Sequence, residues 1–90
     1  MVTVSGRVKG KVQGVGFRYF VQDSARLHSV AGYVKNAVDG SVEFVLQGPP
    51  AQVQALVGCI EKGPRFSKVE HLEYLESVPS ETFNTFELRY

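Results

Sequence analysis

The hydrophobic period of this sequence switches repeatedly between two residues and about 3.6 residues, and the order of the switches restricts the folds available to it. Alternating apolar and polar side chains predict strands with one buried face, whereas apolar spacings of three and four predict amphipathic helices. The predicted order is strand, helix, strand, strand, helix, strand and a last short strand, over residues 2–12, 18–28, 32–38, 41–47, 50–63, 66–78 and 85–90. This order is typical of a split βαβ arrangement.

The element order predicts an α+β fold. Two helices on one face of a mainly antiparallel sheet bury both helical stripes, and the other face of the sheet then stays in water. The helices connect their strands by right-handed crossovers. A chain of 90 residues holds one hydrophobic core, so we expect a single domain over residues 1–90.

Short turn signals separate the predicted elements. Asp39-Gly40 has the composition of a two-residue hairpin loop with a type I′ turn. Val69 and Leu72 are three positions apart in the fourth predicted strand, so we expect a bulge or a bend there. Residues 77–84 are predicted to form a loop before the last strand.

The composition argues against several classes of protein. A net charge of +1 argues against a nucleic-acid binder held by bulk charge and against a polybasic membrane anchor. The single cysteine, Cys59, excludes an internal disulfide and an all-cysteine zinc site. The sequence begins in a strand pattern without a signal peptide, and no apolar run approaches the ~20 residues that span a bilayer. We therefore expect a cytoplasmic protein with no nucleic-acid or membrane partner.

A short glycine-bearing turn joins the first predicted strand to the first predicted helix. Gly14 and Gly16 permit backbone conformations in which several amides point inward, next to the electropositive end of the helix. The helix dipole disfavours Arg18 at that end unless an anion lies between them. The planar guanidinium fork of Arg18 suits a phosphoryl group. The glycines together with Arg18 predict an anion site. The glycines alone would be equally consistent with an ordinary tight turn between a strand and a helix.

Asn36 is the second polar residue that stands out from its surroundings. Strict alternation places its amide on the same face of the second strand as Val34 and Val38. A buried amide without partners costs about 1–3 kcal/mol. One interpretation is a hydrogen bond to the backbone of the nearby turn. The other is an amide that holds a water molecule or substrate beside the anion site, and the spacing favours neither interpretation.

The other groups that could carry chemistry have simpler interpretations. His28 lies on the apolar stripe of the first predicted helix, where a packed or half-exposed histidine is the common case. His71 has no second ligand at a metal-binding spacing, so we expect no metal site. Cys59, next to Ile60, is interpreted as a small core or boundary residue.

Two stretches of the sequence match a known family. Residues 8–18, VKGKVQGVGFR, resemble the first acylphosphatase signature throughout. Residues 32–36, GYVKN, followed by Gly40, Val42 and Gly48, resemble the second. The similarity covers essentially the whole chain. It implies a ferredoxin-like βαββαβ sandwich in a small, cytosolic, cofactor-free enzyme that hydrolyses acyl phosphates to carboxylate and inorganic phosphate.

The resemblance also implies residue roles. Arg18 would bind the phosphoryl oxygens together with the loop amides, Asn36 would orient the attacking water, and no covalent intermediate would form. The implied phosphate-binding residues are Gln13, Gly14, Val15, Gly16, Phe17 and Arg18. The implied partners are an acyl phosphate substrate and inorganic phosphate, which is both product and competitive inhibitor. No metal or cofactor is implied, and we expect a monomer.

Three positions depart from common usage in that family. Tyr33 stands where a tryptophan is frequent and should keep the packing role of an aromatic ring. Ser29 stands where a glycine often ends the first helix, so either a left-handed cap there carries strain or the helix closes in another way. His28 replaces a usual aliphatic residue. These departures concern the end of the helix and not the anion site.

Three other functions compete with this one. An RNA-binding module with the same element order needs exposed aromatic side chains on its central strands, whereas the first strand offers Arg7, Lys9 and Lys11. A closer rival is an acylphosphatase-like domain that binds carbamoyl phosphate within a larger maturation enzyme. The lack of zinc-ligand clusters in the sequence favours the free-standing enzyme. A phosphate sensor that only binds is the third alternative, because a phosphate site does not prove turnover.

Overall fold

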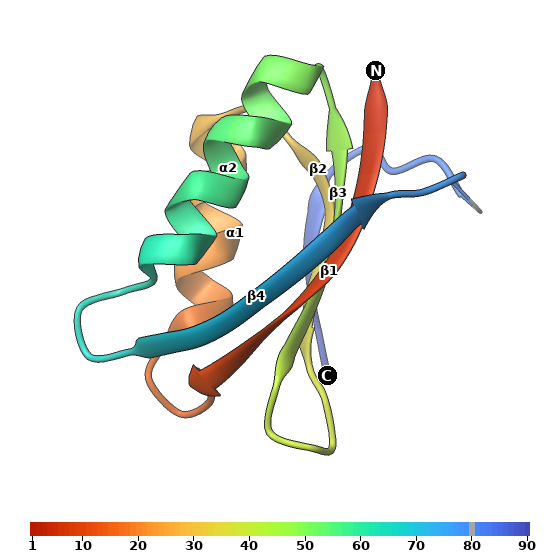
Figure 1. The fold of residues 1–90 in the computed structure, drawn as a ribbon. Helices are drawn as coiled ribbons and strands as arrows, with labels where there is room; N and C mark the ends of the chain where they lie inside the picture. Colours follow the sequence, from red (N-terminus) through yellow and green to blue (C-terminus); the bar gives the residue numbers. More distant parts are fainter. Residues whose placement is uncertain (80) are drawn as a thin grey trace.

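Two helices cover one face of an open sheet in the computed structural model, which describes residues 1–79 and 81–90 (Figure 1). Within that range the elements are β1 (Val2–Lys11), α1 (Phe17–Leu27), β2 (Ala31–Asn36), β3 (Val42–Gly48), α2 (Pro50–Lys62), β4 (Lys68–Glu76) and β5 (Phe86–Arg89). The strands form a mixed sheet in the order β4-β1-β3-β2-β5. The predicted α+β sandwich with its additional terminal strand is confirmed. Ser80, which falls in the loop predicted over residues 77–84, lies outside the described residues.

The strand directions bring three strand ends together. β3 runs antiparallel to both β1 and β2, so β1 and β2 point the same way, and β5 pairs parallel with β2. The C-terminal ends of β1, β2 and β5 therefore lie at one end of the sheet, the lower end in Figure 1, with the β1–α1 loop and the β2–β3 turn. Residues that are far apart in the sequence become neighbours there.

The hydrophobic core lies between the sheet and the two helices. The predicted stripe of the first helix is buried at Val21 and Ala25. The predicted stripe of the second helix is buried over its whole length, at Val53, Leu56, Val57 and Ile60. Phe17 and Phe44 are among the largest fully buried side chains. Since Phe17 is the first residue of α1, the helix begins from a position that the core fixes.

The sheet face opposite the helices is not entirely solvated. The Gln47 amide donates to the Thr3 hydroxyl at 3.1 Å and to the Glu81 carbonyl at 3.2 Å, and it accepts the Phe83 N–H at 2.9 Å. The prediction of a wet face is wrong at this point, because part of the segment between β4 and β5 covers it. The Tyr33 ring lies 5.9 Å from the Phe83 ring, so it does keep an aromatic packing role.

Strand β4 contains the predicted irregularity. Lys9 pairs with His71 and Gly10 pairs with Val69, so Glu70 is an extra residue opposite β1. A Cβ atom at Gly10 would overlap the backbone of β4, and the φ angle of Gly10 is 130°. The bulge is therefore confirmed, and it requires glycine on the facing strand.

The β2–β3 hairpin lies where Asp39-Gly40 predicted it, but its turn is different. The Ala37 N–H donates to the Ser41 carbonyl at 2.8 Å, and residues 38–40 form the loop between them. Gly40 has a φ of 93°, and Asp39 is not in the positive-φ region. A type I′ turn requires positive φ at both central residues, so that prediction is wrong. The Asp39 carboxylate instead accepts hydrogen bonds from the Ser41 N–H at 3.0 Å and from the Ser41 hydroxyl at 2.6 Å.

Strand β2 ends at Asn36, before the predicted boundary at residue 38. Val34 is fully buried and Asn36 is half-buried, whereas Val38 is fully exposed in the loop. The face that these three residues were expected to share therefore ends at Asn36. The longer loop accounts for the difference, because Asn36 is the last residue of β2 that pairs with β3.

Helix α1 ends in a Schellman motif without glycine. Beyond the C-cap residue His28, the Val30 N–H donates to the Ala25 carbonyl at 2.9 Å and the Ser29 N–H donates to the Arg26 carbonyl at 3.3 Å. Ser29 has a φ of 56°, in the left-handed region. Of the two outcomes expected for this helix end, the strained left-handed cap is the one observed.

We expect Ser29→Gly to stabilise the protein. A left-handed conformation costs a residue with a Cβ atom about 1–2 kcal/mol, and the greater freedom of glycine in the unfolded chain offsets part of the gain. The expected rise in Tm, followed by circular dichroism, is roughly 2–8 °C for a domain of this size. Ser29→Ala retains the Cβ atom and serves as the control. A Tm for Ser29→Gly at or below that of the unsubstituted protein would contradict this explanation.

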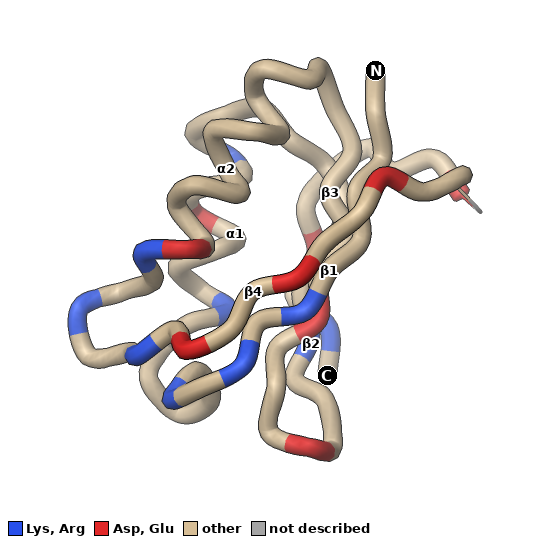
Figure 2. The backbone as a smooth tube through the Cα atoms, viewed as in Figure 1, with Lys and Arg blue, Asp and Glu red and all other residues tan. Residues whose placement is uncertain are grey.

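Positive charge is distributed unevenly along the molecule. In Figure 2 the blue segments gather mainly in the lower half of the view, toward the end of the sheet where the three strand ends meet. Red segments are interspersed with them, in keeping with a net charge of +1. The field on a bound anion at that end therefore depends on local groups rather than on bulk charge.

Candidate functional site

The loop between β1 and α1 presents main-chain donors at the start of the helix. Gly14 and Gly16 have φ angles of 75° and 76°, both in the left-handed region. Gly16 is the N-cap of α1 and supplies no side-chain cap, and no acidic residue lies in the first turn. The first helical hydrogen bond runs from the Phe20 N–H to the Gly16 carbonyl. The N–H groups of Phe17, Arg18 and the next residue thus have no partner within the helix, which favours an anion there.

A cavity of about 170 Å³ opens at this helix start. It is lined by Val12, Gly14, Gly16, Phe17, Arg18, Tyr19 and Asn36. Liquid water takes up roughly 30 Å³ per molecule, so the cavity has room for a phosphoryl group and a water. The two residues that stood out separately in the sequence, Arg18 and Asn36, therefore share one cavity.

The guanidinium of Arg18 is held by the end of β5. Its Nη1 donates to the Arg89 carbonyl at 2.9 Å, and its carbon lies 4.7 Å from the centre of the Tyr90 ring. A guanidinium has five N–H donors, and this contact occupies one of them. A role for β5 in the site was not predicted from the sequence. A main-chain carbonyl leaves no signal in the residue types, although an aromatic residue next to the last strand could have suggested the contact with Arg18.

Asn36 carries an unsatisfied polar atom. Its Oδ1 is buried and has no hydrogen-bond partner among residues 1–79 and 81–90. An unpaired buried acceptor costs about 1–3 kcal/mol, which a donor such as a water molecule can offset. Of the two interpretations of Asn36, a hydrogen bond to the turn is not observed for Oδ1. Oδ1 is therefore an unpaired acceptor on a residue that also lines the cavity.

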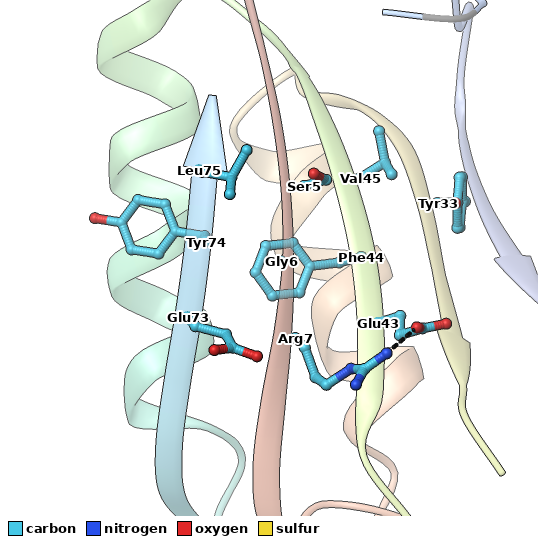
Figure 3. A pocket seen from close by; sticks show the side chains of 10 residues that line it. All are labelled: Ser5, Gly6, Arg7, Tyr33, Glu43, Phe44, Val45, Glu73, Tyr74 and Leu75. Atoms are coloured by element: carbon cyan, nitrogen blue, oxygen red, sulfur yellow. Dashed lines mark hydrogen bonds and ion pairs between the residues drawn. The ribbon is translucent and has the colours of Figure 1, made fainter. Parts of the chain in front are cut away.

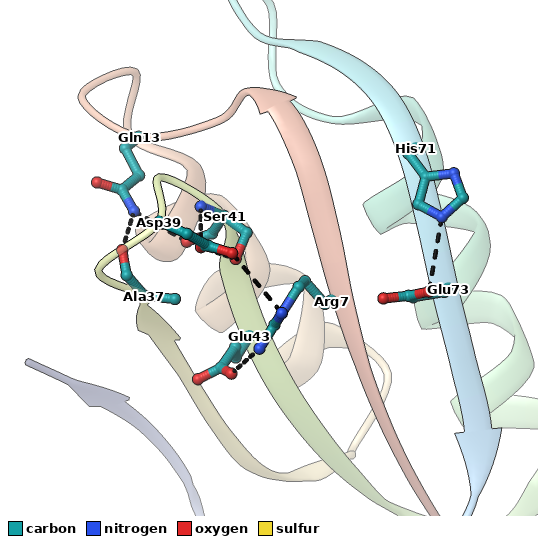
Figure 4. Close-up of polar contacts among 8 residues, drawn as sticks. All are labelled: Arg7, Gln13, Ala37, Asp39, Ser41, Glu43, His71 and Glu73. Atoms are coloured by element: carbon teal, nitrogen blue, oxygen red, sulfur yellow. Dashed lines mark hydrogen bonds and ion pairs between the residues drawn. The ribbon is translucent and has the colours of Figure 1, made fainter.

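Gln13 and Val15 are not among the residues that line the cavity. The Gln13 Nε2 donates to the Ala37 and Ser41 carbonyls, at 2.8 Å each, on the β2–β3 hairpin (Figure 4). Val15 is half-buried and packs against the hydrophobic core. Of the six residues expected to bind phosphate, Gly14, Gly16, Phe17 and Arg18 therefore line the cavity.

A larger hollow lies on the opposite face of the sheet and has a different character (Figure 3). It has a volume of about 500 Å³, and Arg7 lies in it between β3 and β4 side chains. Arg7 is paired with Glu43 at 2.6 Å and with Asp39 at 3.6 Å. The hydrogen bond to Glu43 is the main cause that raises the pKa of Arg7 above its usual value. Its charge is thus compensated, whereas Arg18 has no carboxylate partner among residues 1–79 and 81–90, so this hollow is the weaker anion site.

The remaining chemical groups lie outside the cavity. His28 Nδ1 is 2.8 Å from the Ser24 carbonyl within its own helix. His71 is exposed, with its Nε2 3.6 Å from Glu73 (Figure 4). Cys59 is half-buried against the core, as expected for a boundary residue. Within residues 1–79 and 81–90, no three His, Cys, Asp or Glu side chains are grouped so that they could hold a metal ion. Among the described residues, no helix combines the length and the apolar character that crossing a membrane requires.

The chain is similar in sequence and in structure to known proteins. A protein-family model described as acylphosphatase matches residues 4–88. The acylphosphatase of Oceanobacillus iheyensis is 43% identical over 84 residues, which cover 92% of this chain and 92% of that one. The crystal structure of acylphosphatase from Bacillus subtilis matches with a TM-score of 0.95 and 42% identity, over 100% of both chains. The crystal structure of T. kodakarensis HypF matches at 32% identity with a TM-score of 0.88, but this chain covers 12% of it.

Proposed function

This chain belongs to the acylphosphatase family, whose members hydrolyse acyl phosphates, and from that premise we propose that the cavity shared by Arg18 and Asn36 is its active site. The substrate is a small acyl phosphate, and the products are a carboxylate and inorganic phosphate. The observation that carries the proposal is that one cavity contains a guanidinium, the uncapped start of a helix and an unpaired buried acceptor.

The phosphoryl group binds between Arg18 and the main-chain N–H groups of the loop. Residues 13–18 supply these groups, with Gln13 and Val15 contributing through the main chain alone. The left-handed glycines and the lack of a side-chain cap on α1 support this assignment, because they leave the donors unpaired. Negative charge spreads over the equatorial oxygens in the transition state of phosphoryl transfer, and these fixed donors and the guanidinium stabilise it.

Asn36 orients the water that attacks phosphorus. The water donates one hydrogen bond to the unpaired Oδ1, which points its lone pair toward the phosphoryl group. The new bond forms between the water oxygen and phosphorus, in line with the bond to the carboxylate oxygen, which breaks. The carboxylate leaves with the bonding electron pair, and it is a weak enough base to depart without an acid. The proton of the water passes to an oxygen of the substrate.

The reaction proceeds without a covalent intermediate. Among residues 1–79 and 81–90, those that line the cavity include no serine, threonine, cysteine, histidine or carboxylate side chain. Such side chains are the common nucleophiles of covalent catalysis, so water is the attacking group that this environment favours. Positioning and electrostatic stabilisation then account for most of the acceleration.

A single assay tests the proposed function. Pure protein is incubated with benzoyl phosphate, and the loss of its ultraviolet absorbance is compared with the loss in buffer. We expect loss that is proportional to protein concentration. Decay at the rate seen in buffer would leave only a phosphate-binding role and would overturn the proposal.

Inorganic phosphate is expected to inhibit the reaction competitively, because it fits the same donors as the substrate's phosphoryl group. Initial rates at several benzoyl phosphate concentrations, with and without phosphate, should show a raised apparent KM at constant kcat. Sodium chloride at matched ionic strength is the control. Inhibition equal to that of the salt control would count against a phosphate site at Arg18.

The same proposal covers the setting in which the enzyme works. We place it in the cytoplasm as a monomer whose single domain, residues 1–90, acts without a cofactor, a nucleic acid or a membrane. Sedimentation of the pure protein at working concentration measures its state of association, and a dimer would contradict this part of the proposal. Cell fractionation tests the location.

A further inference from the structure

The side chain of Gln13 connects the two halves of the cavity from outside it. Its Nε2 donates to the Ala37 and Ser41 carbonyls, at 2.8 Å each, and the contacts join residues 24 and 28 positions apart (Figure 4). Gln13 directly precedes Gly14 of the loop, and Ala37 directly follows Asn36. The two hydrogen bonds therefore tie the loop to the end of the strand that carries Asn36.

Gln13 has no side-chain donor left for a phosphoryl group. A primary amide offers two N–H donors, and each of the two carbonyl contacts uses one of them. The side chain is half-buried, and Gln13 does not line the cavity. A phosphate contact would have to break one of these hydrogen bonds to a neutral carbonyl and turn the side chain away from the hairpin.

The acceptor end of this connection is fixed by the hairpin itself. The Ser41 carbonyl also accepts the Ala37 N–H at 2.8 Å. The hydrogen bonds from Ser41 to the Asp39 carboxylate hold the pKa of that carboxyl below its usual value, and the charge of Arg7 adds to the effect. The carboxylate thus stays ionised and bonded to the loop. Gln13 is anchored to a turn with a defined conformation.

Asn36 has less support from the sheet than the residues before it. The pairing of β2 with β5 ends at Lys35, whereas the pairing with β3 includes Asn36 as its last residue. Asn36 is therefore flanked by a strand on one side only. The hydrogen bond from Gln13 to the adjacent Ala37 carbonyl supplies the missing restraint.

We infer that Gln13 is a positioning residue, which sets the separation between the phosphate-binding loop and Asn36. It thereby aligns the attacking water with phosphorus and makes no contact with the substrate through its side chain. The inference rests on the proposed function, because it requires a phosphoryl group in the loop and a water on Asn36. Displacing a reacting group by about 1 Å can cost on the order of 10²-fold in rate, so the loss of this connection should be visible in kcat.

The test is Gln13→Met, which keeps the length of the side chain and removes both donors. We expect kcat for benzoyl phosphate to fall on the order of 10–100-fold. The Ki of inorganic phosphate should change by less than about threefold, because Arg18 and the loop amides remain. Rates are expressed per folded molecule, with the folded fraction measured by circular dichroism.

Two further variants separate positioning from stability. Gln13→Glu places carboxylate oxygens against the two carbonyls and should lower kcat at least as much as Gln13→Met. Gln47→Met removes another bridging amide, which joins Thr3 and Glu81 on the far face of the sheet. We expect it to lower stability and to leave kcat within about twofold.

Two results would overturn the inference, and a third would remove the proposed function; the measurements distinguish all three. A Ki for phosphate that rises in proportion to the lost kcat/KM would make Gln13 a phosphate ligand and overturn the inference. Full kcat in Gln13→Met, with stability alone reduced, would make its role structural and also overturn it. An unsubstituted protein that fails to hydrolyse benzoyl phosphate would instead remove the proposed function, on which the inference rests.

Discussion

Arg18→Ala is expected to lower kcat/KM for benzoyl phosphate by about 10²–10³-fold or more, by analogy with the loss of a single oxyanion donor. Within residues 1–79 and 81–90, the guanidinium is the only charged group that lines the cavity, so its removal leaves the phosphoryl charge to neutral donors. The Ki of inorganic phosphate should rise as well, because the product carries the same charge. Steady-state kinetics on the purified variant measure both quantities.

Two companion variants show whether geometry or charge is responsible. Arg18→Lys retains the charge but not the planar fork, so we expect most of the loss to persist. Arg26→Ala removes an exposed arginine from the last turn of the same helix and is the matched control. We expect no change in its kcat/KM. Equal rates for Arg18→Ala and Arg26→Ala would remove Arg18 from the mechanism.

Asn36→Ala should nearly abolish hydrolysis while the protein remains folded. Without the amide, the attacking water loses the acceptor that orients it, and we expect kcat to fall about 10²-fold or more. The Ki of phosphate should change little, because the phosphoryl donors are untouched. The substitution also removes a buried acceptor that has no partner among the described residues. Stability should therefore hold or increase by up to about 1 kcal/mol, as measured by urea denaturation.

An increase in stability with a loss of turnover would distinguish a functional polar group from a structural one. Asn84→Ala, at an exposed position between β4 and β5, is the control and should alter neither quantity. Turnover of Asn36→Ala at the unsubstituted rate would mean that another group orients the water. A large drop in its stability would mean that the amide of Asn36 has a structural role instead.

Hydrophobic periods and turn residues predicted most of the fold, because each depends on only a few neighbouring residues in the sequence. The period of the apolar side chains located every helix and strand, and the change of phase at Val69 located the bulge in β4. The turn at Asp39-Gly40 was predicted at the right place with the wrong geometry. Its conformation depends on hydrogen bonds from Ser41 to the Asp39 carboxylate, which composition alone does not specify. The cover over Gln47 was missed, because it depends on the path of the chain after β4.

The two central residues of the candidate site were found because each conflicts with its local environment. Arg18 is a cation at the positive end of a helix, and Asn36 is an amide in an apolar row. Such conflicts are visible in a sequence, since they need only the secondary structure to be recognised. The hydrogen bonds of Arg18 with Arg89 and of Gln13 with Ala37 were not predicted, because both acceptors are main-chain carbonyls that every residue possesses.

The hydrogen bond from Arg18 to the Arg89 carbonyl spans 71 positions of the chain. Closing a loop of that length costs entropy before the contact can form. During synthesis, the helix start and its glycines leave the ribosome long before their last partner does. Docking of β5 beside β2 therefore completes two features at once, because it buries Phe86 in the core and gives the guanidinium its anchor.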